Sequence, residues 1–245
     1  MSAVVVNWNG WRDTALCLTS LLAQEDADLR IVVCDNASGD DSVVQLRTWI
    51  ADRPGAEQER LHLLPLERNR GYAGGLNAGI RWAQAHWPAA LFWLLNNDLH
   101  AEPAALRELV AARARVPSAG LCGSVLLEWN EPSRVQAVGG RYRKWLGVGW
   151  HEKTPVEAPD DVCLTMDYPV GASLLVGRDY LERVGPMEES YFLYGEEVDW
   201  VERGRRLGYV PVVALRSRLR HKEGASPAPW EACAASPCCR SAMAW

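Results

Sequence analysis

Two amides and a carboxylate follow directly after an apolar run in the segment Phe92-Trp-Leu-Leu-Asn-Asn-Asp98. A strand buried on both faces reads as a continuous apolar run, and ligands of parallel sheets bind beyond the carboxyl ends of the strands. We therefore expect Asp98 to lie at a ligand site, where its carboxylate suits Mg²⁺ or Mn²⁺. Taken alone, the segment also fits a turn that ends a strand, and this alternative stays open.

A second acidic group, Glu196, Glu197 and Asp199, places three carboxylates within four residues, beside aromatic side chains. Crowded like charges and partial burial raise the pKa of a carboxyl group. A carboxylate with a raised pKa can act as a general base near neutral pH. The alternative is an acidic first helical turn that the helix dipole stabilises.

The composition is that of an ordinary globular protein: of 245 residues, 48% are hydrophobic and 23% are charged. The formal net charge of −5 argues against a general nucleic-acid-binding protein, and no apolar stretch approaches the ~18 residues that span a bilayer. The chain enters an apolar strand at once, without a basic leader, so we expect a cytoplasmic protein. Cys17, Cys34 and Cys122 lie in apolar segments without zinc-binding spacing, and we expect them to be buried.

The first half alternates apolar runs with helical patterns. Strands are predicted at residues 3–6, 31–34, 61–66 and 91–95, and helices at 14–22, 42–50, 76–86 and 103–116. This alternation implies right-handed crossovers and an α/β fold with a mostly parallel sheet. Polar residues end each strand, from Asn7 through Asp35 and Asn69 to Asp98. Four polar strand ends at one edge of a sheet favour a nucleotide or a similar polar ligand.

The second half is less regular. Strands are predicted at residues 121–127, 135–138, 163–168, 172–176, 210–213 and 217–220, a helix at 197–207, and a glycine- and tryptophan-rich segment at 139–150. We expect one domain over residues 1–226, with a nucleotide-binding half at 1–116 and an acceptor and catalytic half at 117–226. Residues 227–245 show no clear periodicity and are expected to form a disordered tail.

The glycine-rich segment from Gly71 to Gly79 does not match the common nucleotide-binding motifs. Ile80 stands where a P-loop requires lysine, and no G-x-G-x-x-G sequence follows a strand. Glycines that open a helix let a phosphate approach the backbone N–H groups. A tight loop required by packing is the alternative.

Several segments match a known family in order and spacing. In the first half they are Val4-Val-Val-Asn-Trp-Asn9-Gly10, Val33-Cys-Asp35-Asn36-Ala-Ser38, Asn69-Arg-Gly71-Tyr-Ala-Gly74-Gly75-Leu-Asn77 and Leu94-Leu-Asn96-Asn97-Asp98. In the second half they are Val170-Gly171-Ala172, the segment from Tyr191 to Arg203, and His221 ahead of Gly224. Over residues 3–226 the chain thus resembles the inverting family 2 glycosyltransferases of the GT-A fold, nearest to their rhamnosyltransferase-like branch.

The resemblance implies a site for a nucleoside-diphosphate sugar. Asp35 would accept a hydrogen bond from the pyrimidine N–H, and the remaining donor-binding residues would be Asn7, Asn9, Ser38, Arg68, Gly71, Gly74, Asn77 and Asn97. Asn96-Asn97-Asp98 occupies the position of the D-x-D motif of the family but keeps only its last carboxylate. Asp98 would be the principal ligand of Mg²⁺ or Mn²⁺, and one carboxylate binds Mg²⁺ weakly without the oxygens of the diphosphate. His221 resembles a second contact to the metal or the diphosphate, with a structural histidine at a strand end as the alternative.

The resemblance also assigns the base. Glu197 takes the place of the catalytic carboxylate of the family, a glutamate for an aspartate, with Glu196 and Asp199 in support. A single displacement by the acceptor hydroxyl inverts the anomeric centre, so no enzyme nucleophile is required.

The implied partners are a dTDP- or UDP-sugar, with rhamnose as the first candidate, and a saccharide or lipid-linked acceptor in cell-surface polysaccharide synthesis. Arg216, Arg218 and Arg220 alternate along a predicted strand and could meet the diphosphate or an anionic lipid at the inner face of a membrane. A solvated edge strand protected by charge is the alternative. Trp11, Trp145 and Trp150 could stack on sugar rings.

Two other functions stay open. A sugar-phosphate nucleotidyltransferase also uses an α/β sheet and a metal, but residues 4–11 lack the glycine- and arginine-rich signature that it would need. A non-catalytic or truncated nucleotide-sugar-binding protein is the other, because residues 227–245 do not resemble the helices that continue the chain in relatives.

Overall fold

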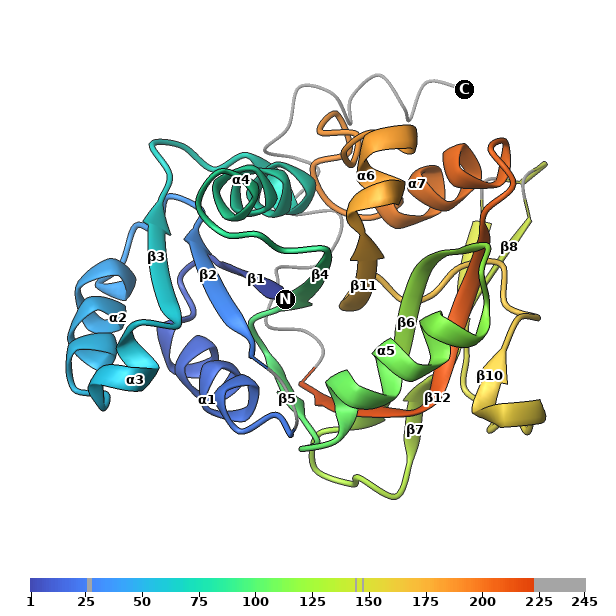
Figure 1. Ribbon diagram of the computed structural model, residues 1–245, viewed down its shortest axis with the longest axis horizontal. Coiled ribbons are helices and arrows are strands. Elements are labelled where there is room, and N and C mark those ends of the chain that lie inside the picture. Colours follow the sequence, from blue (N-terminus) through green and yellow to red (C-terminus); the bar gives the residue numbers. More distant parts are fainter. Residues whose placement is uncertain (26–27, 144, 147, 223–245) are drawn as a thin grey trace.

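The computed structural model describes residues 1–25, 28–143, 145–146 and 148–222 (Figure 1). Its first half contains β1 (Ser2–Asn7), α1 (Trp11–Leu22), β2 (Arg30–Asp35), α2 (Ser42–Ala51), α3 (Gly55–Gln58), β3 (Leu61–Pro65), α4 (Gly71–His86), β4 (Leu91–Asn96), β5 (Leu99–Ala101) and α5 (Ala105–Arg115). Its second half contains β6 (Ala119–Glu128), β7 (Val135–Ala137), β8 (Gly139–Arg143), β9 (Val148–Glu152), a 3₁₀ turn (Pro159–Asp161), β10 (Val162–Cys163), β11 (Ser173–Gly177), α6 (Arg178–Val184), α7 (Glu196–Arg205) and β12 (Val210–His221).

One twisted sheet of ten strands organises the described residues. Its order is β10-β12-β6-β11-β4-β1-β2-β3, with β5 beside β12 and β7 beside β6. Strands β1 to β4 pair in parallel, β12 pairs with β6 in parallel, and β11 runs antiparallel to both β4 and β6. The expected α/β fold with a central, mostly parallel sheet is therefore confirmed. The sheet continues across the expected boundary between residues 116 and 117, and the expected tail at 227–245 lies outside the described residues.

Helices cover both faces of the sheet (Figure 1). Ala3 and Val5 of β1 pack in the cluster that contains residues of α1, α2 and α5. Val4 and Val6 face the opposite way, into the cluster that contains residues of α4, α6 and α7. Successive side chains of a strand point to opposite faces, so covering both faces demands a continuous apolar run. That requirement is why residues 3–6 predict a strand correctly.

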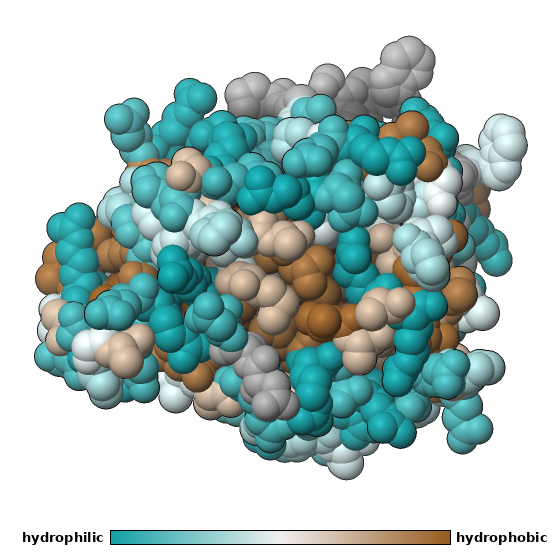
Figure 2. Space-filling view, in the orientation of Figure 1, coloured by the Kyte–Doolittle hydropathy of each residue, from teal (hydrophilic) through white to brown (hydrophobic). Residues whose placement is uncertain are grey.

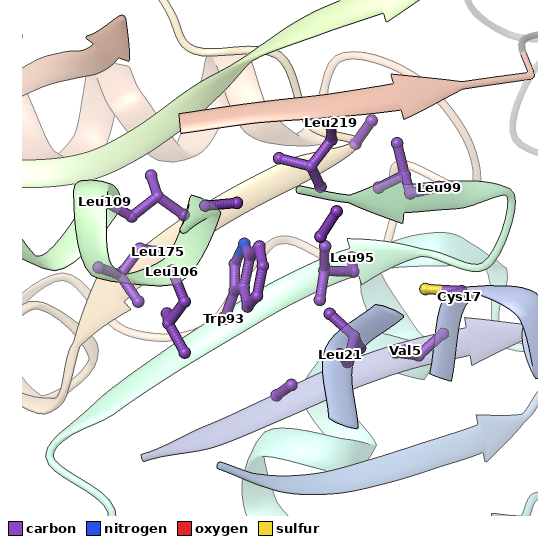
Figure 3. Close-up of a cluster of buried hydrophobic side chains, with 14 of the residues drawn as sticks. Val5, Cys17, Leu21, Trp93, Leu95, Leu99, Leu106, Leu109, Leu175 and Leu219 are labelled. Atoms are coloured by element: carbon purple, nitrogen blue, oxygen red, sulfur yellow. The ribbon is translucent and has the colours of Figure 1, made fainter. Parts of the chain in front are cut away.

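The first cluster joins the two halves of the chain (Figure 3). Trp93 and Leu95 of β4 lie beside Leu109 of α5, Leu175 of β11 and Leu21 of α1. Each buried side chain of this size contributes about 1.5–3 kcal/mol of hydrophobic stabilisation. Cys17, Cys34 and Cys122 are buried as expected. In the orientation of Figure 2, hydrophilic side chains cover most of the surface and apolar ones gather near its centre.

Helix α4 begins at Gly71, five residues before the predicted start at residue 76. The glycines that suggest a loop lie inside the helix because they pack against the sheet. A Cβ atom on Gly79 would lie 2.3 Å from a methyl group of Val4, and one on Gly75 would lie 3.0 Å from a methyl group of Val6. These two glycines let α4 approach β1 closely, which is the packing alternative for this segment.

Differences from the predicted elements are larger in the second half. The two strands predicted at 210–213 and 217–220 form one strand, β12, whose register against β6 is irregular between Ala214 and Arg218. The strand predicted at 163–168 is only β10, and the glycine- and tryptophan-rich segment at 139–150, for which no element is predicted, contributes to the hairpin of β8 and β9. Strand β5 and helix α6 have no predicted counterpart. Short or edge elements carry little apolar periodicity, so their sequences do not predict them.

Candidate active site

The carboxyl ends of β1, β2 and β4 lie at one edge of the sheet. The register pairs Asn7 with Asp35 and Val6 with Asn96. Asp35 and Asp98 therefore end up on the same side of the molecule, as the pattern of polar strand ends predicts.

Asp35 is held in a rigid hydrogen-bonded arrangement and is 1% exposed. Its Oδ2 accepts from Asn7 Nδ2 at 2.7 Å and from Ser38 Oγ at 2.7 Å, and its Oδ1 accepts from the backbone N–H of Ser38 at 3.0 Å. Each carboxylate oxygen has two lone pairs, so Oδ1 can accept a further hydrogen bond. Asn7 and Ser38 thus orient the carboxylate rather than compete for its free acceptor position.

Thr14, in the first turn of α1, links the Asp35 group to the Asp98 segment. Its Oγ1 donates to Asn7 Oδ1 at 2.7 Å and accepts from Asn97 Nδ2 at 3.0 Å. A Cβ on Gly10 would lie 2.8 Å from Asn97 Nδ2, so this close approach needs glycine. Asn97 is therefore a positioning residue that anchors the turn carrying Asp98. The sequence shows no signal for Thr14, because an isolated threonine in a helix has no distinctive spacing.

Asn9 joins the loops that follow β1 and β2. Its backbone N–H donates to Ser38 Oγ at 2.9 Å, and its Oδ1 accepts from the backbone N–H of Gly39 at 2.8 Å. Asn9 and Ala37 both have positive φ values, 53° and 58°. Left-handed backbone at a residue other than glycine costs roughly 1–2 kcal/mol, and the contacts of Asn9 and Ser38 maintain it here.

The start of α4 is not an open phosphate site, contrary to one expectation. Gly71 N–H donates to Asn69 Oδ1 at 2.9 Å and Tyr72 N–H donates to the carbonyl of Phe192 at 3.0 Å. Gly71 has a φ of 70°, and a Cβ there would lie 2.4 Å from the carbonyl oxygen of Phe192. Close packing against residue 192 therefore explains this glycine. Two of the N–H groups that a phosphate would need are already bonded within the protein.

Gly74 and Asn77 of α4 are also in close contact with neighbouring residues of the protein. A Cβ on Gly74 would lie 2.5 Å from Arg70 Cβ. The side chain of Asn77 donates to the carbonyl of Met187 at 2.8 Å and accepts from the N–H of the same residue at 3.2 Å. Asn77 holds the segment around Met187 against α4, and the assignment of Gly74 and Asn77 as nucleotide contacts stays a prediction. Arg68 is exposed in the loop after β3 and stays a predicted groove residue.

Asp98 and His221 come together at the far end of this edge. Strand β5 pairs with the end of β12, with Leu99 opposite His221, and the Nε2 atom of His221 lies 3.4 Å from Asp98 Oδ1. Asp98 is 7% exposed, and its Oδ1 is buried without a hydrogen-bond partner among the described residues. A buried carboxylate oxygen without a partner is costly unless a cation or donor reaches it.

This pair fits a divalent cation that also binds substrate oxygens. Among the residues that the structure describes, no group of three or more His, Cys, Asp and Glu side chains is arranged to hold a metal. The chain would thus contribute Asp98 and His221, and the remaining positions would be filled by a ligand and water. Mg²⁺ and Mn²⁺ sites that act on phosphates commonly have few protein ligands.

Glu196 and Glu197 form a buried carboxyl pair at the start of α7. Burial, and then the charge of Glu197, raise the pKa of Glu196 to about 8. Burial also raises the pKa of Glu197, which backbone N–H groups partly offset. The Oε2 atom of each side chain is buried without a hydrogen-bond partner in the described part of the chain. Such a pair retains a proton near neutral pH, as the crowded acidic sequence predicts.

Tyr72 lies close to Glu197 and was not expected from the sequence. Its hydroxyl donates to the carbonyl of Gly171 at 3.0 Å, and a Cβ on Gly171 would lie 3.4 Å from the carboxyl carbon of Glu197. Burial raises the pKa of Tyr72 well above the usual value, and the charges of Glu196, Glu197 and Asp98 raise it further. Its position within the glycine-rich motif was the available signal.

Asp199 pairs with an arginine of its own helix. Its Oδ2 accepts from Arg203 Nε at 2.7 Å, one helical turn later. Arg203 also donates to the carbonyls of Val184 and Pro186. Asp199 therefore helps to attach α7 to the loop after α6, and its supporting role in catalysis stays a prediction.

The arginines of β12 do not face the site. Arg216, Arg218 and Arg220 are exposed and alternate with buried Ser217 and Leu219, so they lie on the face opposite His221. This orientation does not favour contact between these arginines and the donor diphosphate. Arg216 fits the alternative of a solvated strand, because its Nε lies 2.6 Å from Asp161 Oδ2. Of the three tryptophans expected to stack on sugars, Trp145 is 99% exposed, Trp150 is 43% exposed, and Trp11 packs beside the core.

Comparison with known proteins settles the family. The family model described as "Glycosyl transferase family 2" matches residues 2–153. The chain belongs to this family. No helix among the described residues of this family 2 member is long and apolar enough to cross a membrane.

Two curated relatives of this family 2 chain have names that refer to glycan synthesis or sugar transfer. The low-salt glycan biosynthesis hexosyltransferase Agl10 of Haloferax volcanii is 24% identical over 208 residues, covering 84% of this chain and 62% of that protein. The N-acetylglucosaminyl-diphospho-decaprenol L-rhamnosyltransferase of Mycobacterium tuberculosis is 28% identical over 236 residues, covering 86% of this chain and 73% of that protein. The chain thus spans between three fifths and three quarters of the length of these two relatives.

Solved structures show the same fold. The mannosyltransferase PcManGT of Pyrobaculum calidifontis, in complex with GDP-Man and Mn²⁺, superposes with a TM-score of 0.66 at 16% identity, over 91% of this chain and 57% of that one. S. aureus TarS 1-349 in complex with UDP superposes with a TM-score of 0.62 at 14% identity, over 88% of this chain and 57% of that one.

Proposed function

We propose that this chain transfers a sugar from a nucleoside-diphosphate sugar to an acceptor hydroxyl group with inversion, in the synthesis of a cell-surface polysaccharide. The observation that carries the proposal is the common location of three groups. Asp35 and Asp98 lie at one edge of the sheet, joined through Asn7, Thr14 and Asn97, and Glu197 lies beside Gly171, whose carbonyl accepts a hydrogen bond from Tyr72. The fold and the family support the same assignment.

The donor binds, in this proposal, along the edge from Asp35 to Asp98. Oδ1 of Asp35 accepts from the N–H of a pyrimidine base, and Arg68, in the loop after β3, would line the groove for the nucleotide sugar. A uracil or thymine base offers such a donor, which makes UDP- and dTDP-sugars the expected class. The rhamnosyltransferase among the relatives makes dTDP-rhamnose the first donor to test.

A divalent cation would be held by Asp98 and His221 together with the oxygens of the diphosphate. When bound, Mg²⁺ or Mn²⁺ supplies charge neutralisation to the leaving diphosphate. The unpartnered Oδ1 of Asp98 supports this site. PcManGT, with Mn²⁺ and GDP-Man in its structure, supports it through the shared fold.

Glu197 is the proposed base for the acceptor hydroxyl group. Its raised pKa makes the carboxylate a stronger base than an exposed glutamate, and the adjacent Glu196 takes up the proton that the pair shares. The acceptor oxygen attacks the anomeric carbon as the bond to the diphosphate breaks, and the hydroxyl proton passes to Glu197. One displacement inverts the configuration.

The acceptor in this proposal is a saccharide or a lipid-linked saccharide. The relative named for N-acetylglucosaminyl-diphospho-decaprenol supports the second class. A lipid-linked acceptor would bring the protein to the cytoplasmic face of a membrane as a peripheral protein. The exposed arginines of β12 are available for that contact, away from the donor site.

Two isosteric variants test the proposal. For donor binding, calorimetry with UDP and with dTDP, each with and without Mn²⁺, compares the wild type with Asp98→Asn and with Asp52→Asn, an exposed control. We expect Mn²⁺ to tighten nucleotide binding, and Asp98→Asn to weaken the Mn²⁺-dependent affinity about tenfold or more, which is about 1.4 kcal/mol. Equal affinities in wild type and Asp98→Asn would remove the metal role of Asp98.

For catalysis, transfer from a panel of dTDP- and UDP-sugars compares Glu197→Gln with Glu182→Gln, an exposed glutamate on α6. Loss of a general base lowers kcat by roughly 10²- to 10⁴-fold, whereas nucleotide binding should persist. Normal turnover by Glu197→Gln would mean that another group is the base. Tight nucleotide binding by the wild type with no transfer to any acceptor would instead favour a nucleotide-sugar-binding protein.

A further inference from the structure

Gln136 on β7 contacts His221 at two points. Its Oε1 lies 2.7 Å from Nδ1 of the imidazole, and its Nε2 donates to the backbone carbonyl of His221 at 3.4 Å. Gln136 is 3% exposed. Strands β7 and β12 both pair with β6, where Val135 lies opposite Leu127 and His221 lies opposite Glu128. The buried amide therefore holds both the ring and the main chain of residue 221.

This contact determines which nitrogen of the imidazole carries the proton. An amide oxygen only accepts hydrogen bonds, so Nδ1 must be the donor. In the neutral ring, Nε2 then has a free lone pair and points toward Asp98 Oδ1, 3.4 Å away. Both atoms are acceptors, and Oδ1 has no hydrogen-bond partner in the described structure. Two acceptors that face each other repel unless a proton or a metal cation lies between them.

The spacing suits a metal ion. Ligands at about 2.1 Å from an octahedral Mg²⁺ or Mn²⁺ ion lie roughly 3 Å apart when adjacent. A small adjustment of the 3.4 Å separation would let one cation contact both Nε2 and Oδ1. Metal-binding histidines generally donate their other ring N–H to an oxygen acceptor, which orients the ring and raises its basicity.

We propose that Gln136 is a positioning residue of the metal site: it holds the Nδ1–H form of His221, so that Nε2 is presented to the cation beside Asp98. This inference rests on the metal site of the proposed function. It also predicts that Gln136 influences the preference of the site for Mn²⁺ over Mg²⁺. A nitrogen ligand favours Mn²⁺ over Mg²⁺, which prefers oxygen, so loss of Gln136 should weaken Mn²⁺ binding more than Mg²⁺ binding.

Metal titration separates positioning from mere packing. With UDP present, Mn²⁺ binding to the full chain is followed by electron paramagnetic resonance, and Mg²⁺ binding by competition, in the wild type, Gln136→Leu, Gln136→Glu and His221→Asn. We expect Gln136→Leu to bind Mn²⁺ about tenfold more weakly, with a smaller change for Mg²⁺. Gln136→Glu keeps an acceptor at Nδ1 and should bind Mn²⁺ at least as tightly as the wild type. Wild-type Mn²⁺ affinity in Gln136→Leu would overturn the proposal.

The tautomer can be observed directly, without metal or turnover. The chain has five histidines, so ¹⁵N–¹H correlation spectra are simple, and the signals missing from His221→Asn identify residue 221. We expect the Nδ1–H form in the wild type and in Gln136→Glu. A neutral His221 protonated at Nε2 in the wild type would refute the proposal even if Gln136→Leu did not fold.

The outcomes also distinguish this inference from the proposed function. If Mn²⁺ does not bind the wild type in the presence of UDP, the metal site itself fails and the inference fails with it. If His221→Asn loses Mn²⁺ but Gln136→Leu does not, the metal site stands and only the role of Gln136 is overturned.

Discussion

The Glu196 side chain offers a test of the buried carboxyl pair that needs no substrate. Replacing Glu196 by glutamine keeps the shape of the side chain and removes one of the two groups whose pKa is raised. Burial is the main cause of that raised pKa, and the charge of Glu197 adds to it. We therefore expect the stability of the variant to depend less on pH than that of the wild type.

The sign and size follow from proton linkage. The pKa of Glu196 is about 8 in the folded protein, against 4.5 for an ordinary glutamate. Between these values the folded state binds more protons than the unfolded state, so raising the pH destabilises the fold. Each extra proton makes the free energy of unfolding fall by about 1.4 kcal/mol per pH unit. From about pH 5.5 to about pH 7.5 the wild type should thus lose roughly 3 kcal/mol through one retained proton.

Urea unfolding in EDTA, at several pH values between about 4 and 8.5, measures this loss. The comparison includes the wild type, Glu196→Gln and the exposed control Glu182→Gln. The control should follow the wild type, whereas Glu196→Gln should show a clearly smaller decrease with pH. Below about pH 4.5 the difference in slope should vanish, because both states then carry the proton.

A flat wild-type stability over this range would refute the reasoning, since no proton would then be retained by the pair. Equal slopes for wild type and Glu196→Gln would place the retained proton elsewhere.

Two further variants test how the strand ends and α4 are held. Thr14→Val removes the hydroxyl that bonds the amides of Asn7 and Asn97, and should lower the free energy of unfolding, measured in urea, by about 1–3 kcal/mol. Thr14→Ser should recover most of this loss. An unchanged urea midpoint for the valine variant would show that the network is dispensable. Gly71→Ala places a Cβ 2.4 Å from a backbone carbonyl at a φ of 70° and should lower the melting temperature by several degrees, whereas Gly39→Ala, with no atom within 4 Å, should not.

The first half of the chain could be predicted because the requirements of its strands and helices are local. A strand covered on both faces needs consecutive apolar residues, and residues 3–6 and 91–95 supply them. Parallel strands bring their carboxyl ends to one edge, so the polar residues after each run predict a common site. The acidic cluster also indicated raised carboxyl pKa values, which Glu196 and Glu197 show.

The same reasoning failed where one residue type serves two purposes. Glycine predicts a loop when read locally, but Gly75 and Gly79 lie inside α4 because the sheet is too close for a side chain. A third carboxylate next to a buried carboxyl pair looks catalytic, but Asp199 accepts a hydrogen bond from Arg203 one helical turn away. Spacing alone does not distinguish these cases, because the deciding neighbour lies elsewhere in the chain.

The sequence by itself determined the alternation of strands and helices, the edge at which Asp35 and Asp98 meet, and the family. The tertiary structure alone decided the partners of the polar groups. It paired β5 with β12 and so set His221 beside Asp98, 123 positions along the chain, and it placed Gln136 behind the imidazole. Local order follows from burial patterns that repeat every two or four residues. A hydrogen bond between distant residues depends on how sheets and helices pack, and no short-range pattern encodes that.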